Sequence, residues 1–133
     1  MLIVDSSVWI DFFNGFSSWQ ATYLKEAISD NHRIIVLGIV AAEILCGIKK
    51  KDSDKILYLL EPYSENNNLI NQDFIEAAYI YRTCREKGLT IRSLIDCIIA
   101  QFCIRTTSEL LAKDKDYQLI SELFSLKLIK NPV

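Results

Sequence analysis

The sequence predicts an α/β fold in which a central parallel β-sheet of about five short strands is flanked by about seven helices. Short apolar runs alternate along the chain with longer segments of helical periodicity, the order typical of parallel strands joined by helices. The apolar runs are nearly free of charged residues, as expected of strands that are covered on both faces. The length of 133 residues suits a single domain spanning 1–133.

The first half of the chain contains two predicted strands and four predicted helices. The strands are the apolar runs 2–4 and 34–37, which contain only Leu, Ile and Val. Apolar residues at helical spacing predict helices at about 6–14, 18–30, 38–48 and 52–61. Residues that often begin or end helices lie near these boundaries, with Ser17 or Ser18 and Asp52 or Ser53 as N-caps and with Gly15, Gly47 and Pro62 as stop signals.

The second half continues the alternation. Apolar runs predict strands at 69–70, 110–112 and 126–129, and helical patterns predict helices at about 72–87, 93–105 and 115–123. Asn71 and Ser93 are suitable N-caps for the first two of these helices, and Gly88 follows the end of the first. We find no repeat, low-complexity tract or linker in the sequence.

Composition and charge narrow the range of functions. A net charge of −2 argues against a protein that holds nucleic acid by charge alone. It does not exclude an enzyme that acts on phosphodiesters, because a divalent cation reverses the local sign of an acidic site. Two basic groups, Lys49–Lys51 and the cluster that runs from Arg82 to Arg92, are compatible with phosphate contacts or with solvated helix ends.

No sequence signal points to a membrane or to export. No apolar run reaches the ~18 residues that a membrane helix needs, and the N-terminus does not have the pattern of a signal peptide. We therefore expect a cytoplasmic protein. The four cysteines form no CxxC pair, so we expect buried, reduced thiols rather than zinc or redox sites at Cys46, Cys84, Cys97 and Cys103.

Carboxylates follow two of the predicted strands directly. Asp5 comes after the strand 2–4, and Asp114 and Asp116 come after 110–112. The carboxyl ends of parallel strands are where open α/β sheets bind ligands. Asp5 is equally suited to cap the helix that begins near Ser6, and an Asp-Lys-Asp turn is also a common solvated loop.

Two further acids interrupt apolar helical segments. Glu43 is the only charged residue in the segment 39–46, and Asp96 is the only one in 94–100. A buried carboxylate costs several kcal/mol unless it is paired or metal-bound, and neither segment contains a cation. The alternatives are an exposed edge of the helix for Glu43 and, for Asp96, a capping box with Ser93.

Carboxylates that converge at strand ends repel one another unless some are protonated or a cation lies among them. Oxygen ligands without nearby His or Cys favour Mg²⁺ or Mn²⁺ over zinc. The single histidine, His32, lies in a polar loop, where we expect it at the surface. Motifs for nucleotide-binding loops and serine hydrolases are absent from the sequence.

Four segments together resemble the PIN-domain family, in particular the VapC-type toxins of toxin–antitoxin pairs. The resemblance covers nearly the whole chain in the right order. It departs from the usual pattern at Ala112, where Thr or Ser is common, at Cys97, where Ala is common, and at Tyr117, where Phe is common. The segments are Ile3-Val4-Asp5-Ser6-Ser7-Val8-Trp9-Ile10-Asp11, Ala41-Ala42-Glu43-Ile44-Leu45-Cys46-Gly47, Ser93-Leu94-Ile95-Asp96-Cys97-Ile98-Ile99-Ala100 and Leu111-Ala112-Lys113-Asp114-Lys115-Asp116-Tyr117.

The resemblance implies a PIN-like fold and a metal-dependent endoribonuclease whose products carry 5′-phosphate and 3′-hydroxyl ends. It implies one or two Mg²⁺ or Mn²⁺ ions held by Asp5, Glu43, Asp96 and Asp114, with Asp116 as the alternative fourth ligand. Ser6 then supports a carboxylate or a bound water, or caps the helix. The implied partners are RNA, a small antitoxin protein whose tail crosses the acidic crevice, and a second copy of the chain in a homodimer.

Three other functions remain open at this point. A PIN-like nuclease of RNA maturation would have the same site and no antitoxin. A module that only binds RNA or protein would show no turnover. A phosphatase with an aspartyl nucleophile typically needs a second Asp where this chain has Ser7.

Five aromatic residues lie near the N-terminus. We expect about half of them in the core and the others at an antitoxin groove or a dimer contact. They are Trp9, Phe12, Phe13, Phe16 and Trp19.

Overall fold

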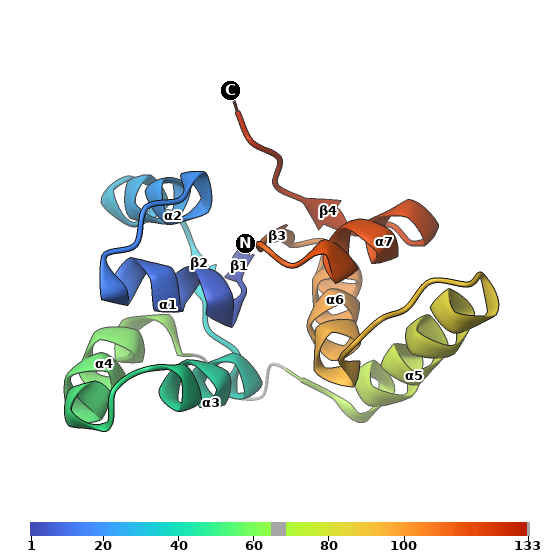
Figure 1. The fold of residues 1–133 in the computed structure, drawn as a ribbon, viewed down its shortest axis with the longest axis horizontal. Coiled ribbons are helices and arrows are strands. Elements are labelled where there is room, and N and C mark those ends of the chain that lie inside the picture. Colours follow the sequence, from blue (N-terminus) through green and yellow to red (C-terminus); the bar gives the residue numbers. More distant parts are fainter. Residues whose placement is uncertain (65–68, 133) are drawn as a thin grey trace.

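A four-stranded parallel sheet lies at the centre of the computed structural model, which describes residues 1–64 and 69–132 (Figure 1). Ile3 pairs with Ile35 on one side and with Leu110 on the other. The predicted α/β class and the parallel sheet are therefore confirmed. The strands, in the spatial order β2-β1-β3-β4, are β1 Leu2–Val4, β2 Ile34–Ile35, β3 Glu109–Leu111 and β4 Lys127–Leu128.

The strand order creates a crevice between the carboxyl ends of β1 and β3. The chain leaves β1 toward β2 on one side and later returns to β3 on the other side. Open α/β sheets bind ligands where the order reverses in this way. The backbone N–H of Asp5 donates to the carbonyl oxygen of Leu111 at 2.9 Å, so the two strand ends are joined directly at this point.

Seven α-helices surround the sheet in the described residues, as the sequence predicts. Figure 1 shows α1 to α4 on one side of the strands and α5 to α7 on the other. None of the helices in the described part of the chain is long and apolar enough to cross a membrane. The helices are α1 Ser6–Asn14, α2 Trp19–Ser29, α3 Gly38–Gly47, α4 Ser53–Leu60, α5 Asn71–Glu86, α6 Leu94–Thr106 and α7 Lys115–Leu123, with the short 3₁₀ helices η1 Lys50–Asp52 and η2 Glu61–Tyr63.

The predicted strand at 69–70 is wrong. Ile70 instead serves as the N-cap of α5, and its backbone N–H donates to the Asp73 carboxylate at 3.0 Å. This capping bond uses the N–H that a strand would offer to a neighbouring strand. A pair of apolar residues fits a short strand and a helix start equally well, so composition alone did not separate the two. Asn71 is consequently the first residue of α5 rather than its N-cap.

Other predicted helix boundaries are confirmed. The hydroxyl oxygens of Ser18 and Ser93 accept backbone N–H bonds at the starts of α2 and α6. Gly15 follows α1 with a φ of 72°, the left-handed conformation that ends many helices. Gly88 follows α5 in the same way with a φ of 79°.

Three of the four cysteines are buried, as the sequence predicts. Cys84, Cys97 and Cys103 are buried free thiols, and burial raises the pKa of the Cys97 thiol to about 12. Cys46 is exposed, so its predicted burial is wrong, because it lies near the end of α3 on the side away from the core. Among the N-terminal aromatics, Trp9 is buried, Phe12, Phe13 and Trp19 pack against the core, and Phe16 is exposed.

A buried ion pair joins α5 to α6. The Asp73 carboxylate is fully buried and accepts bonds from Arg105 at 2.7 Å and 2.8 Å. Burial alone would raise the pKa of Asp73, but the bonds from Arg105 and Ile70 outweigh it and lower the pKa.

Asp73→Ala is expected to lower the free energy of unfolding by about 3 kcal/mol, since it leaves Arg105 without this partner. Urea unfolding measures this loss, with the exposed Asp54→Ala as control, and an effect as small as the control's would contradict it.

Candidate active site

A cavity of about 480 Å³ lies beside the carboxyl ends of β1 and β3. The four acids that the sequence analysis assigned to one site all line it, although they come from distant parts of the chain. Two basic side chains and three serines share the same walls. The complete lining consists of Asp5, Ser6, Ser7, Glu43, Arg92, Ser93, Asp96, Lys113 and Asp114.

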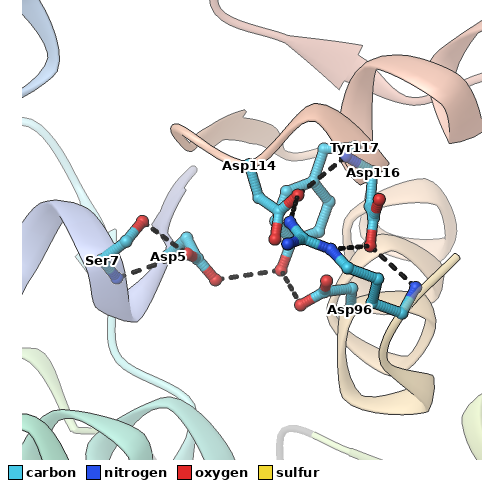
Figure 2. A network of polar contacts seen from close by, with 7 residues as sticks. Asp5, Ser7, Asp96, Asp114, Asp116 and Tyr117 are labelled. Carbon is cyan, nitrogen blue, oxygen red and sulfur yellow. Dashed lines mark hydrogen bonds and ion pairs between the residues drawn. The ribbon is translucent and has the colours of Figure 1, made fainter.

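Asp5 is both a helix cap and a wall of the cavity. It lies between β1 and α1, and its Oδ2 accepts bonds from the Ser7 hydroxyl at 2.7 Å and the Ser7 backbone N–H at 3.3 Å (Figure 2). The two roles that the sequence left open are thus compatible. The capping bonds hold one carboxylate oxygen in place and turn the other toward the centre of the site.

Asp96 lies in the first turn of α6 and is 8% exposed. Its pKa is raised to about 7, mainly by burial and then by the charges of Asp5 and Asp114. Ser93 is the N-cap of α6, as predicted, and its hydroxyl oxygen accepts the backbone N–H of Ile95 at 3.1 Å. Asp96 is therefore held in the crevice by the start of a well-capped helix.

Tyr117 connects Asp5 with Asp96. Its hydroxyl lies 2.9 Å from Asp5 Oδ1 and 3.2 Å from Asp96 Oδ1, and its ring is fully buried (Figure 2). A phenol has one proton, so the two carboxylates share it unless one carboxyl group is protonated and donates to the phenol oxygen. The raised pKa of Asp96 makes Asp96 the suitable proton carrier.

Sequence reasoning missed this role of Tyr117, which it noted only as a departure from the usual Phe. The available signal was its hydroxyl: a buried Tyr O–H usually finds a hydrogen-bond partner. Burial and the charges of Asp5 and Asp96 raise the pKa of Tyr117 well above its ordinary value. The phenol therefore remains a hydrogen-bond donor over the whole physiological pH range.

Tyr117→Phe is expected to lower the free energy of unfolding by about 1.5–3 kcal/mol in metal-free buffer, because a buried bond to a charged group is lost. Urea unfolding in EDTA measures the change. Tyr58→Phe is the matched control, since Tyr58 is 75% exposed and its hydroxyl is not in the site. Equal stability of the two variants would show that the Tyr117 hydroxyl contributes nothing to the fold.

Glu43 reaches the cavity from α3 and carries an unpaired buried atom. Its Oε1 has no hydrogen-bond partner among the described residues. Burial and then the charge of Asp5 raise the pKa of Glu43, whereas the Ser6 side chain lowers it through a hydrogen bond. Glu43 is half-buried and lines the cavity, so it does not point wholly to solvent, as the alternative left open by the sequence would require. Of the two roles considered for Ser6, the hydrogen bond to a carboxylate is the one found, and the carboxylate is that of Glu43. The N-cap of α1 is Asp5.

Arg92 bridges the two acids of the β3–α7 loop. Its Nη2 donates to Asp114 Oδ1 at 3.0 Å, and its backbone N–H donates to Asp116 Oδ2 at 2.9 Å. The Arg92 side chain is itself 72% exposed. Asp114 lines the cavity, whereas Asp116 is buried behind it and is not part of the lining. The sequence placed Arg92 only in a general basic cluster, since its pairing depends on how this loop packs against the start of α6.

A second ion pair fixes the same loop from the other side. Lys113 Nζ donates to Asp11 Oδ2 on α1 at 2.6 Å, and the Lys113 side chain lines the cavity. The partners are far apart in the sequence, so no local pattern predicts the pair. Together with Arg92, Lys113 places two positive charges at the rim of an otherwise acidic site.

The comparisons with known proteins agree with this geometry. The family model of the PIN domain matches residues 2–123. The chain belongs to the PIN-domain family. It is similar to the VapC ribonuclease Mb1587 of Mycobacterium bovis, with 31% identity over 129 residues and 96% of both chains covered. It is equally similar, at 31% identity and 96% coverage of both chains, to ribonuclease VapC11 of Mycobacterium tuberculosis.

The acidic residues of this PIN domain fit a divalent cation. Asp96, Asp114 and Asp116 each offer an oxygen, and these oxygens lie within 4.8 Å of one another. Asp5 and Glu43 lie outside this tight group but line the same cavity. The buried, unpartnered Oε1 of Glu43 and the raised pKa of Asp96 are both relieved by a positive charge. All of these donors are oxygens, which favour hard cations.

Proposed function

We propose that this PIN-domain protein is a metal-dependent endoribonuclease that hydrolyses RNA phosphodiester bonds and acts in the cytoplasm as the toxin of a type II toxin–antitoxin pair. The observation that carries the proposal is the convergence of Asp5, Glu43, Asp96 and Asp114 in one cavity at the reversal of the strand order. The names of the two relatives, both ribonucleases of the VapC type, support the choice of RNA.

The proposed cofactor is Mg²⁺ or Mn²⁺. Asp5, Asp96 and Asp114 would hold it, with Glu43 as a further ligand, directly or through water. When bound, such an ion lowers the pKa of water and neutralises charge that develops on a phosphate. We assign the role of fourth ligand to Asp114 rather than Asp116, because Asp114 lines the cavity and Asp116 does not.

The chain's own groups position the reactants. Ser7 and Tyr117 fix the two oxygens of Asp5 in separate directions, and Ser6 restrains Glu43. Arg92 and Lys113 line the same cavity as the acids. Their positive charges favour an anionic substrate and counter the repulsion that the carboxylates exert on it.

The proposed partners are a small antitoxin protein and a second copy of this chain. Exposed apolar side chains on α4 and α5 are surfaces that protein contacts could cover, in particular Leu57, Tyr58, Phe74, Ile75 and Tyr79. A pull-down from the native host should return a small protein encoded beside this gene. Recovery of the chain without such a protein would leave an RNA-processing nuclease as the better assignment.

The activity is tested on structured RNA with Mg²⁺, with Mn²⁺ and with EDTA. Cleavage is expected with either metal and is expected to stop in EDTA. Asp5→Asn should remove cleavage while the protein stays folded, because the amide cannot offer a negative ligand. Asp54→Asn, on the exposed part of α4, is the matched control. Unchanged cleavage by Asp5→Asn, or RNA binding without metal and without turnover, would overturn the nuclease assignment.

A further inference from the structure

A second cavity, of about 340 Å³, adjoins the acidic one and shares Lys113 and Asp114 with it. We call it the lysine groove. Three segments form it: the start of α2, the β3–α7 loop with α7, and the end of β4 with the chain after it. Its lining is Trp19, Gln20, Ala112, Lys113, Asp114, Lys115, Gln118, Leu128, Ile129, Lys130 and Asn131.

The charge of the lysine groove differs from that of the acidic site beside it. Among the described residues, three lysines line it, and Asp114 is its only carboxylate. Lys113 is paired with Asp11, whereas Lys115 and Lys130 form no ion pair within the part of the chain that the structure describes. Lys115 is the first residue of α7, where a cation is unfavourable for the helix dipole. Helix stability therefore does not account for Lys115.

Trp19 gives the groove an aromatic surface. It is the first residue of α2, after the N-cap Ser18, and it is half-buried with part of its ring against the core. The chain has two tryptophans, and the other, Trp9, is 1% exposed. Trp19 is thus the tryptophan that a ligand can reach, and its ring is held in place by its packing.

We propose that the lysine groove is a nucleotide-binding subsite for a single-stranded segment of RNA next to the cleaved phosphate, with Trp19 stacking on a base and with Lys115 and Lys130 binding phosphates. Positively charged grooves with an aromatic platform bind unpaired nucleic acid, because the lysines follow the backbone and the ring stacks on a base. The shared wall with the acidic site makes the path continuous. This inference rests on the proposed nuclease function.

The geometry also limits the class of RNA. A base inside a duplex is stacked on its neighbours and cannot stack on Trp19, so the subsite requires unpaired loops or ends. Gln20 and Gln118 line the groove, and their amides can bond to the Watson–Crick edges of bases, which paired strands do not offer. The expected substrates therefore carry an unpaired segment at the cleavage site.

Binding is tested in the Asp5→Asn background, which separates binding from turnover. The probe is an unstructured mixed-sequence oligoribonucleotide, compared with a blunt RNA duplex. Trp19→Ala should raise the Kd for the single strand on the order of 5- to 100-fold, and Trp19→Phe should restore most of the affinity. The single strand should quench the fluorescence of the parent protein and not that of Trp19→Phe, whose remaining tryptophan is buried.

Lys130→Gln provides a second variant whose exposed side chain has no role in the core. It should make the slope of log K against log salt shallower by about 0.7, as expected when one phosphate contact to a single strand is lost. Lys55→Gln is the matched control on α4, which Figure 1 shows far from β4, on the opposite side of β1. It should leave the Kd and the slope unchanged.

The outcomes separate the subsite from the nuclease function. If the parent chain cleaves RNA but the Trp19 and Lys130 variants bind and cleave it as before, the subsite is wrong and the nuclease assignment stands. Equal affinity for single strand and duplex would also overturn it. If the variants weaken only the binding of the co-encoded antitoxin, the groove is a protein-docking site instead. Absence of cleavage by the unmodified chain with Mg²⁺ and Mn²⁺ would overturn the nuclease function itself.

Discussion

Asp96→Asn is expected to lower kcat/KM for RNA by about 1,000-fold or more and, at the same time, to stabilise the metal-free protein. The loss of activity corresponds to about 4 kcal/mol of transition-state stabilisation. The gain in stability follows because the variant removes a buried acid whose neighbours Asp5 and Asp114 repel its charge. Catalytic sites often carry groups that disfavour the fold in this way.

The gain depends on pH, and its direction follows from the raised pKa of Asp96. In the folded state this pKa is about 7, and in the unfolded chain it is close to the ordinary value of about 3.9. Between these values the folded protein binds more protons, so the contribution of Asp96 to stability falls as pH rises from about 4 to about 7. Three pKa units correspond to about 4 kcal/mol, and solvent screening of this partly exposed site reduces that figure. Asn does not titrate, so the variant should gain on the order of 2 kcal/mol at pH 8 and little at pH 4.

Urea unfolding of both proteins in EDTA, at several values from pH 4 to pH 8, measures this difference. The exposed Asp54→Asn serves as control and should show no such dependence on pH. A variant that is less stable than the parent chain at pH 8 would contradict the prediction. It would mean that the bond of Asp96 to Tyr117 stabilises the fold by more than burial and charge repulsion at Asp96 destabilise it.

The acids of the site could be found from sequence because each of them violates a local rule. Asp5 and Asp114 follow apolar strands, and Glu43 and Asp96 are single charges in apolar helical segments. Three of these acids lie at a strand end or in the first turn of a helix. Parallel strands then bring those positions to one edge of the sheet whatever the details of packing.

The neighbours of these acids could not be found in the same way. The contacts of Tyr117 with Asp5, and of Lys113 with Asp11, join residues more than 100 positions apart, and their partners are fixed only by tertiary packing. The error at 69–70 has a different origin. Two apolar residues fit a short strand and a helix start equally well, and a side chain three residues later, Asp73, decides between them.

Addition of Mg²⁺ or Mn²⁺ is expected to raise the Tm of the metal-free protein by roughly 10 °C at a metal concentration 100 times the Kd. Binding at this ratio stabilises a folded protein by about 2.7 kcal/mol, and each kcal/mol shifts the Tm of a domain of this size by about 3–4 °C. The physical basis is that one positive charge stabilises two carboxyl groups that the metal-free fold leaves unfavourably placed. They are Glu43, whose buried Oε1 has no partner among the described residues, and Asp96, whose charge is disfavoured by burial and by neighbouring acids.

Protons compete with the ion for Asp96, so the apparent affinity for metal should weaken below about pH 7 and stay constant above it. Thermal unfolding across a metal titration at pH 6 and pH 8 tests both statements. Asp96→Asn should start from a higher metal-free Tm at pH 8 and lose the metal-induced shift, whereas Asp54→Asn should keep it. These two variants separate a specific site from general screening of negative charge, because screening would raise the Tm of both. An equal shift in Asp96→Asn would therefore place the cation somewhere other than this cavity.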